Sequence, residues 1–513
     1  MSVTEFQARP FQKEHPSYQK SVLDFPVAPE WTTGEVLLAS LCRVLGLAGR
    51  STDRTVDLEL IPQLANRLTE KGVLGASSGL WQLLFGEQGC LRSPALTRSR
   101  FPNLSPTVPL LAAHGGVLGG VRSRWTPGNF LLACIASGAG PQGYPALVGA
   151  LIESLGVGSS DDVYARFLQE SLWPVTDVTD PPNPSDFDEW KHLAYRRSRA
   201  EALSPSERFV DDLPKVLRLK RGLSREQWVA VLEAQLRLAA VAYALWICRL
   251  NAVCWSLSLD ALAGQEVPDP SEVELTFFKS HHSPARAFLE VGRDTERAFS
   301  ATLEGYVRAR LGLNLLLHRF SDAGAAWTKP IGTADQGRSC SAAIVDFLKH
   351  VRAERLKVSP DPRVWLQERC EQLLDKNSRA AAGKSGPPKN IREFLQYLTR
   401  QVVPRNATQR SYDQAYLAPS LSPRQQVWLL QPGPNMLLLL VHCVCSQRPG
   451  VPSTIEDLRK HLAAYGIRIA SEELESGRFM GNLAALGLTI DSPDAYGGRV
   501  LVDPFLSSQE SAS

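Results

Sequence analysis

The sequence predicts a mainly α-helical protein of several domains that ends in a small module of three helices and a β-hairpin. Apolar residues recur at spacings of three and four through most of the 513 residues, as they do on buried helix faces. A strand, turn and strand pattern, LTIDSPDAYGGRVLVDPF, lies near the C-terminus. The length exceeds what one hydrophobic core usually serves, which favours about three or four domains.

The first 173 residues are expected to form an extended arm followed by a helical domain. Residues 1–30 contain four prolines, which favours an arm that lies on a neighbouring domain or subunit. Over residues 31–173, apolar helical stretches alternate with breaks rich in Gly and Pro, so an all-helical domain is expected. Residues 174–190 are rich in Pro and Asp and are predicted to be a linker.

One glycine pattern in the N-terminal domain has a functional and a structural interpretation. Gly138, Gly140 and Gly143 spell G-x-G-x-x-G, the skeleton of a turn that binds a dinucleotide. Pro141 and Pro145 remove backbone donors where N–H groups would meet a pyrophosphate, so a loop between helices is the preferred interpretation. A nucleotide-dependent enzyme that uses the Gly138–Gly143 loop remains an alternative.

Residues 191–330 are predicted to form a central helical domain around one long helix over residues 225–257. Ser224 and Gln227 form a capping box, which sets the start of this helix. At 1.5 Å per residue the helix is roughly 50 Å long, which suits the spine of a domain. The longest unbroken apolar run, residues 238–248, is shorter than the ~20 residues of a membrane-spanning helix, so a soluble, cytoplasmic protein is expected.

Two basic segments are candidate nucleic-acid contacts, because Lys and Arg neutralise phosphates. The first segment contains Lys215, Arg218, Lys220 and Arg221. The second is a predicted flexible linker over residues 376–392, within a helical segment over residues 331–422; its cations are Lys376, Arg379, Lys384, Lys389 and Arg392. Ion pairs with neighbouring acids, or a solvated face, are the alternative interpretation of both segments.

A helix expected over residues 341–358 is also basic towards its end. Its cations are Lys349, Arg352, Arg355 and Lys357. These four cations are not among the predicted contacts.

The C-terminal module is predicted over residues 423–506, with a disordered tail over residues 507–513. Its first helix is the apolar stretch PNMLLLLVHCVCSQ. Ser453 and Glu456 form a capping box for a second helix, which Gly466 is expected to end by taking a positive φ.

The third helix of the module is predicted to begin after Ser471 and to end at Gly487. Arg478 and Asn482 are four residues apart, so they face outward together. After the helix, apolar and polar residues alternate on both sides of a segment rich in Pro, Asp and Gly, which predicts a hairpin.

This order of three helices and a hairpin resembles a winged helix-turn-helix domain; we find no resemblance of the whole chain to a family. The resemblance implies that the third helix and the hairpin contact DNA or a protein partner. The implied positions are Ser476, Arg478, Asn482 and Arg499. Residues 424–513 carry seven Lys or Arg and nine Asp or Glu, which favours docking to protein over direct reading of DNA.

The predicted function is that of a non-catalytic accessory subunit associated with nucleic acid. A long helical protein with one terminal winged helix resembles accessory subunits of bacterial multi-subunit defence or chromosome-maintenance systems. DNA is one candidate partner, and protein partners of a larger complex are expected. Nine cysteines without a C-x-x-C spacing do not predict a metal site, and we predict no cofactor. A protein scaffold that never touches nucleic acid is the alternative.

Overall fold

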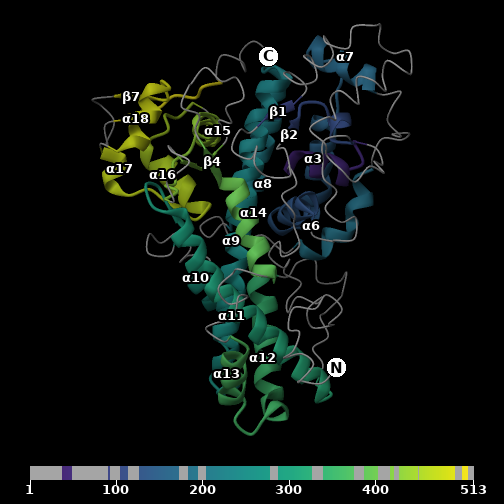
Figure 1. The fold of residues 1–513 in the computed structure, drawn as a ribbon, viewed down its shortest axis with the longest axis vertical. Helices are drawn as coiled ribbons and strands as arrows, with labels where there is room; N and C mark the ends of the chain where they lie inside the picture. The colour runs from purple at the N-terminus through teal and green to yellow at the C-terminus, as the bar shows by residue number, and fades with distance from the viewer. Residues whose placement is uncertain are drawn as a thin grey trace.

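The computed structural model describes a chain that is mostly helical, which confirms the predicted mainly α class (Figure 1). The described residues are 37–48, 90–92, 104–113, 126–172, 183–194, 204–277, 287–325, 339–374, 386–402, 416–420, 427–448, 450–475, 477–491 and 499–505. The predicted arm over residues 1–30 and the predicted tail over residues 507–513 lie outside these ranges.

The longest described helix, α9 (Arg225–Leu262), is the axis on which the other helices pack (Figure 1). It begins with the expected capping box between Ser224 and Gln227 and runs five residues beyond the expected end at residue 257. By length and composition α9 alone among the described helices could cross a membrane. However, 78% of its most apolar window is buried inside the protein, as in the core helix of a soluble protein.

The N-terminal elements pack on one side of α9. They are α3 (Leu37–Val44), α6 (Pro127–Leu155), α7 (Val163–Leu172), α8 (Pro205–Arg218) and the 3-10 helices η2 (Pro109–Ala113), η4 (Pro184–Leu193) and η5 (Leu219–Arg221). An antiparallel pair of β1 (Cys90–Arg92) with β2 (Leu104–Pro106) corrects the all-helical expectation for residues 31–173. Strands of three residues are too short to show an alternating pattern.

The second half of the predicted linker over residues 174–190 is part of the packed body. It forms η4, which packs against α6, and the Tyr144 hydroxyl donates a 3.0 Å hydrogen bond to the Phe187 carbonyl. Trp190 is completely buried. The aromatic residues Phe187 and Trp190, which follow the last proline of the segment, therefore anchor it to the body despite the linker composition.

The G-x-G-x-x-G pattern lies inside α6 and is not a turn between a strand and a helix. Gly140, at φ 73° and ψ 171°, kinks the helix. A Cβ on Gly138 would lie 2.2 Å from the Ser206 carbonyl oxygen of α8. These two glycines thus allow a kink and a close helix contact, which is the physical reason for the pattern.

The lower half of α9 carries a helical stalk (Figure 1). Its helices are α10 (Pro270–Phe277), α11 (Thr295–Asp322), α12 (Cys340–Val358) and α13 (Pro362–Leu373), while α14 (Gly386–Thr399) lies at the level of α6 (Figure 1). The end of the predicted flexible linker, residues 386–392, is the first half of α14, because Ile391, Phe394 and Leu395 bury an apolar stripe. Short parallel strands follow, β4 (Arg400–Val402) with β5 (Ala418–Ser420).

The C-terminal elements pack on the opposite side of α9 from the N-terminal helices (Figure 1). They are α15 (Pro434–Cys445), α16 (Ile455–Ala464), β6 (Ile467–Arg468), α17 (Ser471–Glu475), α18 (Arg478–Ala485), β7 (Thr489–Asp491) and β8 (Arg499–Leu501). β7 and β8 pair antiparallel, as the hairpin pattern predicts. Gly466 and Gly487 have φ values of 73° and 66° at the helix ends.

Two details of the C-terminal module differ from the sequence interpretation. The capping box of α16 is formed by Thr454 and Asp457, one residue after the predicted pair. The predicted third helix is two helices, because the Glu473 carboxylate accepts a 3.1 Å hydrogen bond from the Phe479 amide and so caps a new helix at Gly477.

The C-terminal module shares its hydrophobic core with the rest of the described chain, which we call the body. β6 pairs in parallel with β3 (Leu289–Glu290), which lies before α11, and Leu430 bridges Val291. Buried apolar side chains form one contiguous cluster from Leu37 to Phe505. The predicted boundary at residue 423 lies outside the described residues, and the described elements on either side of it share this cluster.

The close contact of α6 with α8 predicts a selective effect of adding a methyl group. Gly138→Ala places its Cβ against the Ser206 carbonyl and should reduce the free energy of unfolding by about 2 kcal/mol, the usual cost of overpacking. Gly143→Ala is the matched control, because its Cβ meets only the Ala139 Cβ at 3.4 Å. Urea unfolding measures both; equal stability of the two variants would contradict the packing role.

Candidate nucleic-acid interface

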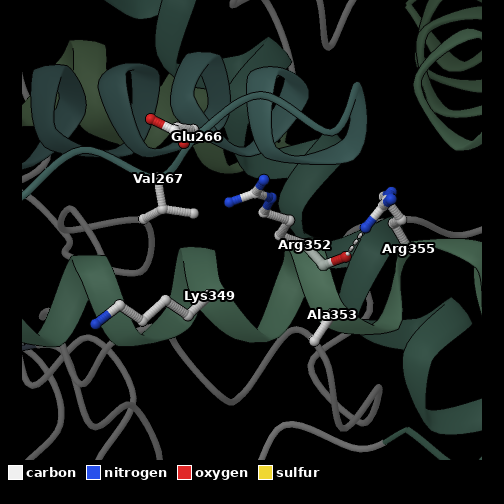
Figure 2. Close-up of a pocket in the computed structure, with 6 residues that line it drawn as sticks. All are labelled: Glu266, Val267, Lys349, Arg352, Ala353 and Arg355. Atoms are coloured by element: carbon white, nitrogen blue, oxygen red, sulfur yellow. Dashed lines mark hydrogen bonds between the residues drawn. The ribbon is translucent and has the colours of Figure 1, made fainter.

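The helix α12 presents a row of cations to a surface hollow of about 520 Å³ (Figure 2). Lys349, Arg352 and Arg355 recur every three residues and so share one face of the helix. Lys349 is exposed, while the two arginines are half-buried. The Arg352 side chain extends from α12 towards Glu266 and Val267, which follow α9 and form the opposite wall (Figure 2).

The cations that line this hollow outnumber its carboxylates in the part of the chain that the structure describes. Within the described residues, no ion pair engages Lys349, Arg352 or Arg355. Arg355 Nη1 donates a 2.7 Å hydrogen bond to the Arg352 carbonyl, which uses one of its donors and holds the guanidinium beside the helix. The lining has three cations and one carboxylate, Glu266, and therefore attracts anions.

Two cations of the first predicted basic segment are committed to internal contacts. Lys215 is 9% exposed, and its Nζ donates to Asp212 Oδ1 at 2.8 Å and to the Cys443 carbonyl at 3.0 Å. Lys220 Nζ lies 3.0 Å from Asp161 Oδ2 and donates to the Gly156 carbonyl. These lysines stabilise the fold and are not open to phosphate.

The environment of Lys220 is cationic as well as buried. Burial and the neighbouring Arg225 lower its pKa, although Asp161 partly opposes them. Arg218 and Arg221, the other two cations of the segment, are exposed. The structure therefore leaves half of this predicted segment at the surface.

The second predicted basic segment falls partly outside the described residues. Lys376, Arg379 and Lys384 lie outside them. On α14, Lys389 is exposed and lies 3.3 Å from Glu393, and Arg392 donates to Glu296 Oε1 at 2.7 Å. Arg392 thus joins α14 to α11.

The positions implied by the winged-helix resemblance have different surroundings. Ser476 lies outside the described residues. On α18, Arg478 is exposed without an ion pair in the described chain, and Asn482 is half-buried. Arg499 on β8 is paired with Asp491, with its Nε 3.0 Å from Oδ1. α18 therefore presents a single unpaired cation.

A buried polar network at the base of the module was missed by sequence reasoning. Asp212 of α8 is fully buried; it accepts a 2.9 Å hydrogen bond from the Tyr465 hydroxyl, and Gln235 of α9 donates to that hydroxyl at 3.0 Å. His461 Nε2 lies 3.1 Å from Asp212 Oδ2, an ion-pair distance. With Lys215, these groups tie the module to α8 and α9.

The position of Asp212 on its helix was the available signal. It lies between Phe209 and Val216 on the apolar face of α8, where a carboxylate requires partners. Burial raises the pKa of the Asp212 carboxyl, but His461, Lys215 and Arg208 outweigh burial and lower it to about 2. The carboxylate is therefore charged in the folded protein at neutral pH.

No protein-family model matches this chain, and a search of curated proteins finds no significant match. Among the residues that the structure describes, no group of three His, Cys, Asp or Glu side chains is arranged to hold a metal ion.

The Asp212 network predicts a stability that depends on pH. In the folded protein the pKa of the Asp212 carboxyl is below its ordinary value of 3.8. The charge of Asp212 therefore contributes fully to the free energy of unfolding above about pH 4, and this contribution disappears as the pH falls towards 2. Asp212→Asn should cost about 3 kcal/mol at pH 7, since it leaves a buried lysine unpaired. The difference in the free energy of unfolding between the wild type and Asp212→Asn should narrow by on the order of 2 kcal/mol at low pH.

Urea unfolding between pH 7 and pH 2.5, followed by tryptophan fluorescence, measures this gap. Asp491→Asn is the control, because its surface ion pair contributes ~0–1 kcal/mol. A gap between the wild type and Asp212→Asn that stays constant over this pH range would show that the Asp212 charge does not stabilise the fold.

Proposed function

We propose that this protein is a non-catalytic accessory subunit that associates with nucleic acid through the cationic row of α12. The main observation in support of this proposal is that Lys349, Arg352 and Arg355 line one hollow and form no ion pair in the described chain. Phosphate contacts dominate affinity for nucleic acid, and arginine forks bind phosphate with two parallel hydrogen bonds. Phosphate is the ligand that this row suits best.

We propose further that the C-terminal module is a winged helix. Support comes from the order α15, α16, α17 with α18, and the β7–β8 hairpin. Val500 of β8 also forms an antiparallel bridge with Thr454, so the segment before α16 lies beside the hairpin.

The module's role in this proposal is docking to a protein partner. Only Arg478 offers an unpaired cation on α18, and the exposed residues after it are small: Gly481, Ala484 and Ala485. Exposed Glu472 and Glu475 on α17 disfavour a phosphate backbone. A larger bacterial complex, in defence or chromosome maintenance, is the setting we propose.

Charge reversal on α12 tests the phosphate contacts. Arg352→Glu should weaken binding of a 30-base-pair duplex about tenfold at low salt and reduce the slope of log K against log salt by about 1. Lys349→Glu should act in the same direction. Fluorescence anisotropy from 50 to 200 mM salt measures both effects.

Arg166→Glu is the matched control for this test. Arg166 is an exposed cation on α7, far from α12 (Figure 1), and its reversal changes the net charge equally. Equal weakening by Arg166→Glu would assign the effect to overall charge. A wild-type protein that binds no nucleic acid at 50 mM salt would favour the scaffold alternative.

If the module docks to protein, a substitution on α18 should affect duplex affinity less than a substitution on α12. Arg478→Glu should change duplex affinity by less than about twofold, because α18 makes no phosphate contact in this proposal. The same anisotropy titration measures it. A loss as large as that of Arg352→Glu would instead show that α18 reads DNA.

A further inference from the structure

A second, larger hollow lies where the body meets the C-terminal module. Its volume is about 960 Å³, within the size range of pockets that hold small organic ligands. α9 contributes Arg249 and Ala252, the start of α11 contributes one wall, and Arg468 of β6 contributes another. The β3–β6 pairing fixes these walls relative to each other.

The rim of this hollow is cationic. Four arginines and two carboxylates line it: Arg249, Arg293, Arg297, Arg468, Glu290 and Asp294. Both carboxylates already have hydrogen-bond partners within the protein. Glu290 Oε1 accepts a 3.1 Å hydrogen bond from Arg468 and lies 3.6 Å from Arg293 Nε, and Asp294 caps α11 through the Glu296 amide. Arg297 is exposed and has no ion pair in the described chain.

One part of the lining of the hollow, which we call its floor, consists of small residues. It is formed by small residues of α9 and α11: Ala252, Ala298, Ala301 and Gly305. A Cβ on Gly305 would lie 3.9 Å from the Ala252 Cβ, so α9 and α11 approach each other closely at these two positions. All four residues are at least partly accessible. A flat ring can lie on such a surface.

The orientation of one arginine adds to this arrangement. The Arg249 guanidinium lies over the Phe288 ring, with its carbon 4.0 Å from the ring centroid. Stacking on an aromatic face restrains the guanidinium plane, which lowers the cost of ordering it around an anion. Thr302, which also lines the hollow, carries a hydroxyl that is able to donate a hydrogen bond.

We infer that this hollow binds a nucleotide unit, with the base on the Ala and Gly floor and the phosphate among the arginines. A rim of guanidinium groups above an apolar floor matches a ligand with one anionic end and one flat apolar end. The unit comes either from a free nucleotide or from the 5′ end of a strand. The inference does not depend on the α12 contacts, which involve different residues.

Calorimetry with the full chain tests this site with five probes: adenosine 5′-monophosphate, adenosine, inorganic phosphate, and a single-stranded 12-mer with and without a 5′ phosphate. Saturable binding of the monophosphate assigns a free nucleotide. Binding of only the phosphorylated 12-mer assigns a strand end. Adenosine and phosphate alone should each bind at least about tenfold more weakly, because each makes only part of the contacts.

Two variants connect the binding to this hollow. Arg297→Glu reverses the unpaired cation, and Ala301→Leu raises the floor; each should weaken binding at least about tenfold. Their matched controls are Arg308→Glu, an exposed cation elsewhere on α11, and Ala301→Ser, and both should stay within about twofold of the wild type. Arg352→Glu on α12 should also leave this binding unchanged.

Three results would overturn the inference. They are the absence of saturable binding of both the monophosphate and the phosphorylated strand, equal weakening by Arg297→Glu and Arg308→Glu, and phosphate binding as tight as that of the monophosphate. Circular dichroism of each variant confirms that its helices are intact. The duplex titration with Arg352→Glu reports separately on the proposed function.

Discussion

The burial of α9 on all sides is the constraint on which the rest of the structure depends. Residues 238–248 are all buried, and eleven consecutive residues span three turns and point in every direction around a helix. One neighbouring helix covers only one stripe of such a surface. α9 must therefore be surrounded, which it is by α3, α6 and α8 on one side, α11 and α12 on another, and α15 of the module.

This constraint explains why the module is joined to the body and does not hang from a linker. α15 completes the cover of α9, and its placement brings Tyr465 and His461 onto the buried Asp212 of α8. The β3–β6 pair adds a second link between the module and the rest of the chain. The same junction forms the larger hollow, whose lining includes Arg249 of α9 and Arg468 of β6.

The sequence was most informative where the determinants are local. The capping box of Ser224 with Gln227 places the start of α9, and Gly466 and Gly487 mark helix ends in the module. The sequence was not informative where the structure depends on contacts between residues that are far apart in the chain. Nothing near Lys220 in the chain reveals that it caps α6 and pairs with Asp161, and nothing near Gly138 reveals the carbonyl of Ser206.

The candidate site follows the same division between local and tertiary determinants. A carboxylate three or four residues away explains why Lys357 and Lys389 are paired, with Glu354 and Glu393. Arg392 has a tertiary partner instead, Glu296 of α11, which no local pattern reveals. Arg352 and Arg355 have no carboxylate at either spacing, so the sequence could have singled them out. Only the fold adds that the facing wall supplies a single acid, Glu266, which leaves the row with an excess of positive charge.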